Sequence, residues 1–253
     1  MKSRLYNFGD SWAWGYNDNF ETPYKTTYAG IIAKNFGLKK VNACLSGWGM
    51  GNVGECFLNH YPDMNSNDCV LVTIPPDTRI AVAMVEGRST RTVFCQDKFW
   101  ETLVEEIGGN PYHFELGIIK ECMMIAGLCK AKNIKYAFQH NYATMYFSDE
   151  WDLSIIKDNF CYPDRSMMDL LGIDNDWYAG SSLEEQVQWD MDGPSFDDRD
   201  KMIPPGQHER KDRLLNRSTH PTPEGAKIIA DKLTHRLREI WDMQPTSGIN
   251  SVN

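Results

Sequence analysis

The apolar residues in the first 140 positions follow two alternating patterns. Four short runs have the length and the bounding turns of β-strands, at Leu5–Phe8, about Lys39–Cys44, Cys69–Ile74 and Ile134–Phe138. Longer segments between them carry apolar side chains at helical spacing. Strands that alternate with helices predict an α/β fold, a mostly parallel sheet covered by helices on both faces.

The predicted helices are Tyr24–Phe36, Asn52–Tyr61, Glu115–Lys132 and a last one near the C-terminus. In the last helix, Thr222 is the expected N-cap and Pro223 suits the first turn. Its apolar stripe, which we expect to face the sheet, consists of Ile229, Leu233, Leu237 and Ile240.

Two segments interrupt the alternation. Ala81–Pro111 is expected to be a helix with loops or an inserted arm. Tyr142–Leu215 is long and rich in aromatic residues, and residues 148–200 within it hold 15 acidic but only three basic side chains. A loop of this length in a compact domain is usually functional or partly disordered. We therefore expect one domain over residues 1–253, with an acidic aromatic insertion at 142–215 that is either a solvated excursion or a wall of the substrate cleft.

Composition and charge narrow the partners. Of the 253 residues 42% are hydrophobic, yet no run of 18 apolar residues could span a membrane. A net charge of −9 argues against a nucleic acid as partner. The chain reaches Gly9-Asp10 too soon for the apolar region of a signal peptide, so we expect cytoplasmic synthesis, or release by lysis.

The seven cysteines are odd in number and scattered, and none form a C-x-x-C pair. Buried free thiols are therefore expected rather than disulfides, with no metal site and no cofactor.

The candidate chemistry begins at Gly9-Asp10-Ser11, directly after the first predicted strand. This is the carboxyl edge of a parallel sheet, where open α/β folds bind ligands. A serine that merely caps a helix would have the same local sequence. His220, fixed by Pro221 before the last helix, is a candidate general base, although a lone histidine there is more often a surface residue.

These positions resemble the SGNH (GDSL-type) hydrolases, a family of esterases, lipases, thioesterases and carbohydrate deacetylases. The family's blocks match Gly9-Asp10-Ser11, Val41–Gly47 and His220–Gly225, in family order. The resemblance implies a three-layer α/β/α sandwich with a flavodoxin-like sheet. It also implies Ser11 as nucleophile, His220 as base, and an oxyanion hole that includes the N–H groups of Ser11 and Gly47. Beyond the resemblance, we expect that Asp10, Arg79 and Arg217 could support the site.

The third block departs from the family pattern. Asp77 stands where the family has an asparagine that completes the oxyanion hole, and an ionised carboxylate would oppose the developing charge. Either Asp77 is protonated, or it turns away and Arg79 or a backbone N–H replaces it.

The last block departs as well. Arg217 stands where the family has the aspartate that orients the histidine. A backbone carbonyl or a carboxylate such as Asp212 or Asp200 could orient His220 instead, so a Ser-His dyad is the safer expectation.

Gly49, Gly51 and Gly54 match the G-x-G-x-x-G pattern of dinucleotide sites. The match follows the second strand rather than the first, and no clear acidic residue ends a strand about 20 positions later. Close backbone approach around Gly47 explains the same glycines, so we expect no nucleotide site.

Two functions remain open. The first is a serine esterase that hydrolyses a small acyl ester. An O-acetyl group on a glycan is favoured because aromatic faces and carboxylates of the insertion suit sugar rings. The second is a catalytically degraded SGNH fold that binds glycan or serves as a structural part, which Asp77 and Arg217 favour. A core of this type without a signal peptide resembles proteins of tailed phages, which act from the virion or during infection. The sequence predicts no particular oligomeric state.

Overall fold

The computed structural model describes residues 3–15, 26–45, 47–75, 79–83, 90–94, 112–141, 152–173, 213–215 and 220–243. Four parallel strands form its central sheet in the order β2-β1-β3-β6: β1 (Arg4–Gly9), β2 (Lys39–Cys44), β3 (Cys69–Ile74) and β6 (Lys135–His140). This is the flavodoxin-like order up to its fourth strand. The four predicted strands are confirmed, and β2 and β3 have the predicted bounds.

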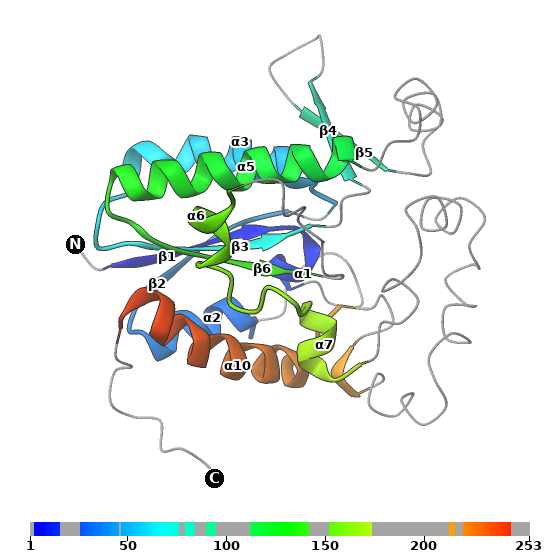
Figure 1. The fold of residues 1–253 in the computed structure, drawn as a ribbon. Helices are drawn as coiled ribbons and strands as arrows, with labels where there is room; N and C mark the ends of the chain where they lie inside the picture. The colour runs from blue at the N-terminus through cyan, green and yellow to red at the C-terminus, as the bar shows by residue number, and fades with distance from the viewer. Residues whose placement is uncertain are drawn as a thin grey trace.

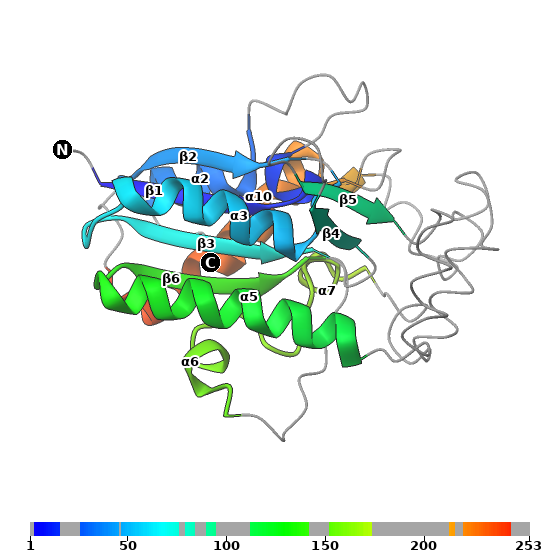
Figure 2. The same ribbon diagram turned by 90° about the horizontal axis from the view of Figure 1, so that it is seen from above.

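Helices cover both faces of this sheet (Figures 1 and 2). On one face lie α3 (Met50–His60) and α5 (Tyr112–Ala131), and on the other lie α2 (Tyr28–Asn35) and α10 (Pro223–Trp241). Successive side chains of a strand point to opposite faces. Tyr6 and Phe8 of β1 therefore join the core under α3 and α5, whereas Leu5 joins the core under α2 and α10. The α/β class and the three layers are confirmed.

Side-chain caps fix where two of these helices begin. The N-cap of α2 is Thr27, whose Oγ1 accepts the N–H of Gly30 at 3.2 Å. The helix therefore begins at Tyr28, later than the predicted Tyr24, because the N-cap residue has an extended backbone conformation and ends the helix on its N-terminal side. α10 begins as predicted, with Thr222 accepting the N–H of Gly225 at 3.2 Å.

The middle of the predicted insertion contributes to the core. The helices α6 (Ser154–Lys157) and α7 (Met167–Leu171) flank a stretch that runs beside β6 through parallel bridges at Phe160 and Ser166. Phe138 of β6 donates its N–H to Asn159 O, and its carbonyl accepts the N–H of Cys161, both at 2.9 Å. This stretch occupies the position of the fifth strand in a flavodoxin-like sheet. Residues 142–151 and 174–212 of the insertion lie outside the described residues.

A separate antiparallel pair consists of β4 (Arg79–Ala83) and β5 (Thr90–Phe94). It lies beyond the carboxyl ends of the parallel strands (Figures 1 and 2). Residues 81–111 were expected to be a helix with loops or an inserted arm. Their described part, 81–83 and 90–94, belongs to this strand pair and is not helical. Residues 84–89 and 95–111 lie outside the description.

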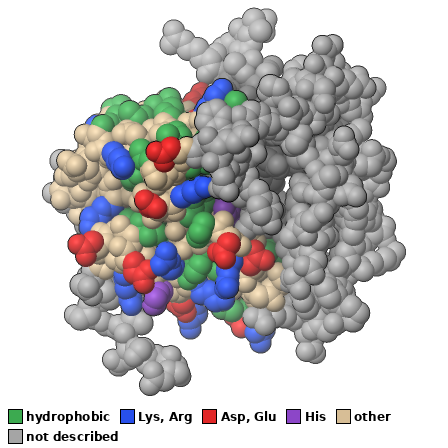
Figure 3. Space-filling model, viewed as in Figure 1, with side chains coloured by type: hydrophobic (Ala, Val, Ile, Leu, Met, Phe, Trp, Pro, Cys, Tyr) green, Lys and Arg blue, Asp and Glu red, His purple; other side chains and the backbone are tan. Residues whose placement is uncertain are grey.

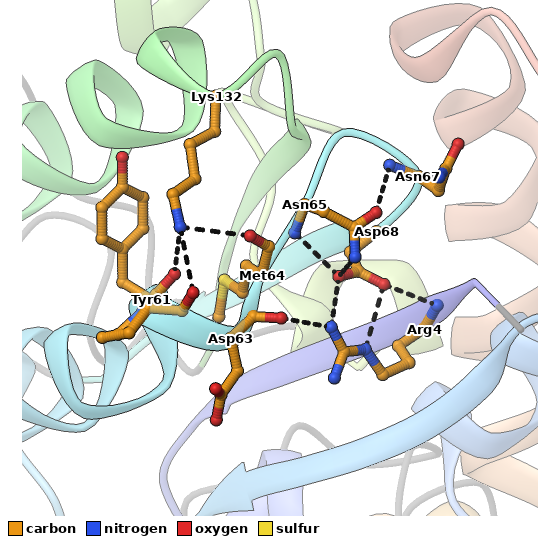
Figure 4. A network of polar contacts seen from close by, with 9 residues as sticks. Arg4, Tyr61, Asp63, Met64, Asn65, Asn67, Asp68 and Lys132 are labelled. Carbon is orange, nitrogen blue, oxygen red and sulfur yellow. Dashed lines mark hydrogen bonds and ion pairs between the residues drawn. The ribbon is translucent and has the colours of Figure 1, made fainter. Parts of the chain in front are cut away.

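A polar network holds the opposite, amino-terminal edge of the sheet (Figure 4). Arg4 of β1 donates from Nε and Nη2 to the two carboxylate oxygens of Asp68, at 3.1 and 2.7 Å. Burial alone would raise the pKa of Asp68, but hydrogen bonds from Arg4 and from the backbone of Asn65 hold it below its usual value. Lys132 donates to Tyr61 O at 2.7 Å and so ties the end of α5 to the turn after α3.

The described residues also bear on the cysteines, on membrane-spanning helices, on metal ligands and on surface charge. The six described cysteines are free, and five of them are buried as predicted, whereas Cys56 is half-buried; the five are Cys44, Cys69, Cys122, Cys129 and Cys161. Within the same residues, no helix is long and apolar enough to cross a membrane, and no group of three His, Cys, Asp or Glu could hold a metal ion. Figure 3 shows Lys and Arg side chains interspersed with Asp and Glu across the coloured part of one face, so that part carries charges of both signs.

Candidate active site

Ser11 lies at the carboxyl edge of the sheet, where the strand order reverses between β1 and β3. It follows β1 as the first residue of the short helix α1 (Ser11–Trp14). Asp10 is the N-cap, and its Oδ1 accepts the N–H of Trp12 at 3.0 Å. The interpretation of Ser11 as a capping serine is therefore wrong, and its hydroxyl is available to another partner.

Gly9 allows α1 to approach the sheet closely. A Cβ at this position would lie 2.7 Å from Ala13 Cβ and 3.0 Å from the carbonyl oxygen of Thr73. Its φ of +154° is also one that residues with side chains rarely adopt. The glycine of the Gly-Asp-Ser turn thus places Ser11 directly above the ends of β1 and β3.

His220 reaches Ser11 from the segment that leads into α10. Its Nε2 lies 2.7 Å from Ser11 Oγ, the distance expected between a nucleophile and its base. The backbone on the C-terminal side of His220 is held because Pro221 pairs with Leu215. Thr222 also donates its N–H to the carbonyl of residue 214 at 2.9 Å. The histidine is therefore presented by backbone pairing as well as by the start of the helix.

Trp12 packs beside the imidazole of His220. The two ring centroids are 6.5 Å apart and the planes are tilted by 44°. Trp12 is itself buried, so it forms a fixed wall that restricts the positions of the imidazole. Our sequence reasoning did not single out Trp12, although its place next to Ser11 was a signal.

A cluster of buried, hydrogen-bonded polar side chains lies beneath the Ser11 turn. Asn7 Nδ2 donates to Ala13 O at 3.0 Å, which ties α1 to β1, and the Cys44 thiol donates to Asn7 O at 2.9 Å. Tyr28 and Thr73 share a hydrogen bond of 2.7 Å between their hydroxyl oxygens. Burial raises the pKa of both Tyr28 and Cys44 well above the usual values, so both are neutral at pH 7 and act as hydrogen-bonding groups.

Asn141 is a second residue that the sequence reasoning missed. It directly follows β6, and its Nδ2 donates to Asp10 Oδ1 at 2.7 Å. A signal was available, because Asn141 follows the fourth predicted strand, Ile134–Phe138, by three residues. Residues just after a parallel strand lie at the carboxyl edge of the sheet, which is also the edge of Ser11.

Of the other predicted site residues, the structure describes Gly47 and the backbone of Arg79. Gly47 lies three residues after the end of β2 at Cys44, which is the register partner of Gly9. Gly47 therefore lies at the same edge of the sheet as Ser11. Its φ of +77° suits a glycine. Arg79 begins β4, and its side chain is outside the description. Also outside the described residues are Asp77, Asp200, Asp212 and Arg217.

Two of the G-x-G-x-x-G glycines have structural roles in α3. Gly49 is the N-cap of α3, and Gly54 is buried within that helix. A Cβ on Gly54 would overlap the carboxyl group of Glu121 from α5. The side chains of α5 thus lie directly over Gly54, and Glu121 would have to move to admit a side chain at this position.

Comparison with known proteins adds two similar structures. No family model and no curated protein matches the chain. One similar solved structure is described as a lipolytic protein of the G-D-S-L family from Desulfitobacterium hafniense DCB-2, with 11% identity and a TM-score of 0.45 over 92% of this chain and 99% of its own. Another is the psychrotrophic esterase EstA from Pseudoalteromonas sp., inhibited by monoethylphosphonate, with 12% identity and a TM-score of 0.43 over 96% of this chain and 100% of its own.

Proposed function

We propose that this chain is a serine hydrolase that acts on ester bonds, with Ser11 as nucleophile and His220 as base. The observation that carries the proposal is the 2.7 Å distance between Ser11 Oγ and His220 Nε2 at the carboxyl edge of the sheet. A serine is a weak nucleophile at neutral pH unless an adjacent base takes its proton. The capping of α1 by Asp10 adds support, because it leaves the Ser11 hydroxyl to the histidine.

The proposed reaction has two halves. Ser11 Oγ attacks the acyl carbon while His220 Nε2 takes the hydroxyl proton, and the carbonyl electron pair moves onto the oxygen. The N–H groups of Ser11 and Gly47 are the proposed donors to this oxyanion. Collapse of the intermediate expels the alcohol, which takes the proton from His220, and leaves the acyl group on Ser11. Water then attacks the acyl carbon while His220 takes a proton from it. The bond between the acyl carbon and Ser11 Oγ breaks, Ser11 Oγ takes the proton back from His220, and the carboxylic acid leaves.

We propose that Ser11 and His220 act as a dyad, in which other contacts than an aspartate three residues upstream orient the imidazole. Pairing of Pro221 with Leu215 fixes the adjacent backbone, and Trp12 packs beside the ring. These contacts would orient His220 in place of the family's aspartate, because Arg217 stands at the aspartate's position, three residues before the histidine. A carboxylate from Asp200 or Asp212 would add to this orientation.

The finer proposal concerns the substrate. We propose an O-acetyl group on a carbohydrate, supported by the tryptophan, tyrosine and acidic residues of 142–215. Aromatic rings stack on sugar faces, and carboxylates accept hydrogen bonds from sugar hydroxyls. The expected result is acetate release from acetylated xylan with little turnover of p-nitrophenyl palmitate. Preference for the palmitate ester would contradict the carbohydrate proposal and leave the esterase proposal standing.

The second candidate is a degraded SGNH fold that binds glycan or forms a structural part of a virion. It is favoured by Asp77 and Arg217, which stand at two chemically demanding positions of the family pattern. Binding of acetylated xylan without acetate release by a folded sample would support it.

Turnover of p-nitrophenyl acetate separates the two candidates. We expect Ser11→Ala and His220→Ala each to lower kcat/KM by about 10³-fold or more, because the pair acts as a unit. Matched controls are Ser66→Ala and His235→Ala, both at exposed positions, the first in the turn before β3 and the second on α10. These two variants should keep wild-type turnover. A folded wild-type protein without turnover, or turnover that survives Ser11→Ala, would sink the esterase proposal.

A further inference from the structure

Asn141 and Asp10 form a buried contact between distant parts of the chain. They are 131 positions apart, and Asn141 Nδ2 donates to Asp10 Oδ1 at 2.7 Å. Asn141 is 1% exposed and Asp10 is 0% exposed. The same Oδ1 accepts the N–H of Trp12 at 3.0 Å. One carboxylate oxygen therefore joins the start of α1 to the end of β6.

The backbone of Asn141 is fixed from two sides. Its N–H donates to Ile74 O at the end of β3, at 3.2 Å, and its carbonyl accepts the N–H of Met167 at the start of α7, at 2.9 Å. The amide side chain therefore starts from a backbone that the sheet and α7 hold in place. Such an anchor can restrict where the Asp10 carboxylate lies.

The position of that carboxylate matters for Ser11. A capping side chain satisfies one of the unpaired N–H groups in the first turn of a helix. Here the cap takes the N–H of Trp12 and not that of Ser11. The proposed oxyanion hole needs the Ser11 N–H, and the proposed nucleophile needs its hydroxyl turned to His220.

We propose that Asn141 is a positioning residue of the Ser11 site. By donating to Asp10 it holds the turn that directs the Ser11 hydroxyl at His220 and leaves the Ser11 N–H for the substrate. This inference rests on the proposed serine hydrolase function, and Asn141 acts through Asp10 rather than on the reacting atoms.

A purely structural role is the competing explanation, and Asn35 provides the matched control. Asn35 is also buried, and its Nδ2 donates to Thr234 Oγ1 at 3.0 Å, which joins α2 to α10. Both asparagines connect segments that are far apart in the chain, but only Asn141 contacts the Ser11 turn. Loss of either amide should cost stability, whereas only loss of Asn141 should alter Ser11.

The experiment compares Asn141→Leu with Asn35→Leu in the full chain. The first readout is the rate of labelling by a fluorophosphonate, which needs an activated serine. The second is hydrogen exchange at the Trp12 amide, which reports the Asp10 cap without any catalysis. We expect Asn141→Leu to slow labelling and to speed Trp12 exchange, each by about 10- to 100-fold, the range that corresponds to a hydrogen bond to a charged group. Asn35→Leu should leave both rates at the wild-type value, and Asn141→Ala serves as second variant if Asn141→Leu does not fold.

The outcomes distinguish this inference from the proposed function. Slower labelling with faster Trp12 exchange in the Asn141 variant alone supports it. Wild-type labelling in the Asn141 variant overturns it, whatever the exchange rate. Equal effects in the two variants also overturn it, because stability alone would then explain them. If the wild-type protein is not labelled, the hydrolase proposal fails. The exchange rate then decides whether Asn141 holds the turn: faster exchange supports this, and unchanged exchange overturns it.

Discussion

Replacing Gly9 by alanine tests how closely α1 must approach the sheet. The added Cβ would lie 2.7 Å from Ala13 Cβ and 3.0 Å from both Cβ and O of Thr73, whereas ordinary contacts begin at 3.4 Å. Overpacking of this kind costs about 1–3 kcal/mol. A φ of +154° adds about 1–3 kcal/mol for a residue with a side chain. The sum predicts that Gly9→Ala lowers the free energy of unfolding by about 2–6 kcal/mol.

The same substitution should also act on the site. Relief of the overlap requires α1 to move away from β3, and α1 begins with Ser11, whose Oγ lies 2.7 Å from His220 Nε2. We expect p-nitrophenyl acetate turnover to fall at least about 100-fold, since displacements of about 1 Å are enough for such a loss.

Urea unfolding followed by circular dichroism measures the stability change. The matched control is Gly127→Ala on the exposed side of α5, where a Cβ meets nothing within 4 Å. It should stabilise by about 0.5–1 kcal/mol, the helical preference of alanine over glycine. A Gly9→Ala protein as stable and as active as the Gly127→Ala protein would show that the site does not depend on the close approach of α1 to the sheet at Gly9.

Three further predictions concern stability. Gly225→Ala should destabilise by about 1–3 kcal/mol in urea unfolding, because its Cβ would overlap the Leu214 carbonyl oxygen, and an unchanged midpoint would contradict this. Burial lowers the pKa of His140 to about 4. Since the unfolded chain binds this proton near pH 6.5, stability should fall by about 2 kcal/mol from pH 7 to pH 5, and His140→Gln should remove that part of the fall. The pKa of Asp68 is lowered despite burial, by hydrogen bonds that include those of Arg4. Asp68→Asn should therefore destabilise by about 1–3 kcal/mol at pH 7, and the difference should vanish as the pH falls through the folded-state pKa; a difference that does not shrink as the pH falls below the usual pKa of aspartate would contradict it.

Much of the sheet could be predicted because its strands have strong local signals. The apolar run of β3 ends at Pro75, which cannot continue a ladder, and its bounds were predicted correctly. The N-cap of α10 was likewise predicted from Thr222 and Pro223. The start of α2 was wrong because apolar spacing extends to Tyr24, whereas the helix starts where the Thr27 hydroxyl caps it.

Contacts made across the chain were harder to predict. Residues 160–166 occupy a strand position beside β6 through only two isolated bridges, so they have no strand pattern to detect. Ser11 and His220 were singled out because each lies in a short motif, and the structure places them 2.7 Å apart. Asn141 had no motif, and its hydrogen bond to Asp10 depends on how β1 and β6 are placed in the sheet.

Peptide mass mapping after reaction with a fluorophosphonate at neutral pH tests directly whether Ser11 and His220 form a catalytic pair. We expect one adduct per chain on the peptide that contains Ser11, present in the wild-type protein and lost in His220→Ala, because the 2.7 Å contact with Nε2 activates the hydroxyl. An adduct on a different serine, or none in a folded sample, would contradict the claim that Ser11 and His220 form a catalytic pair.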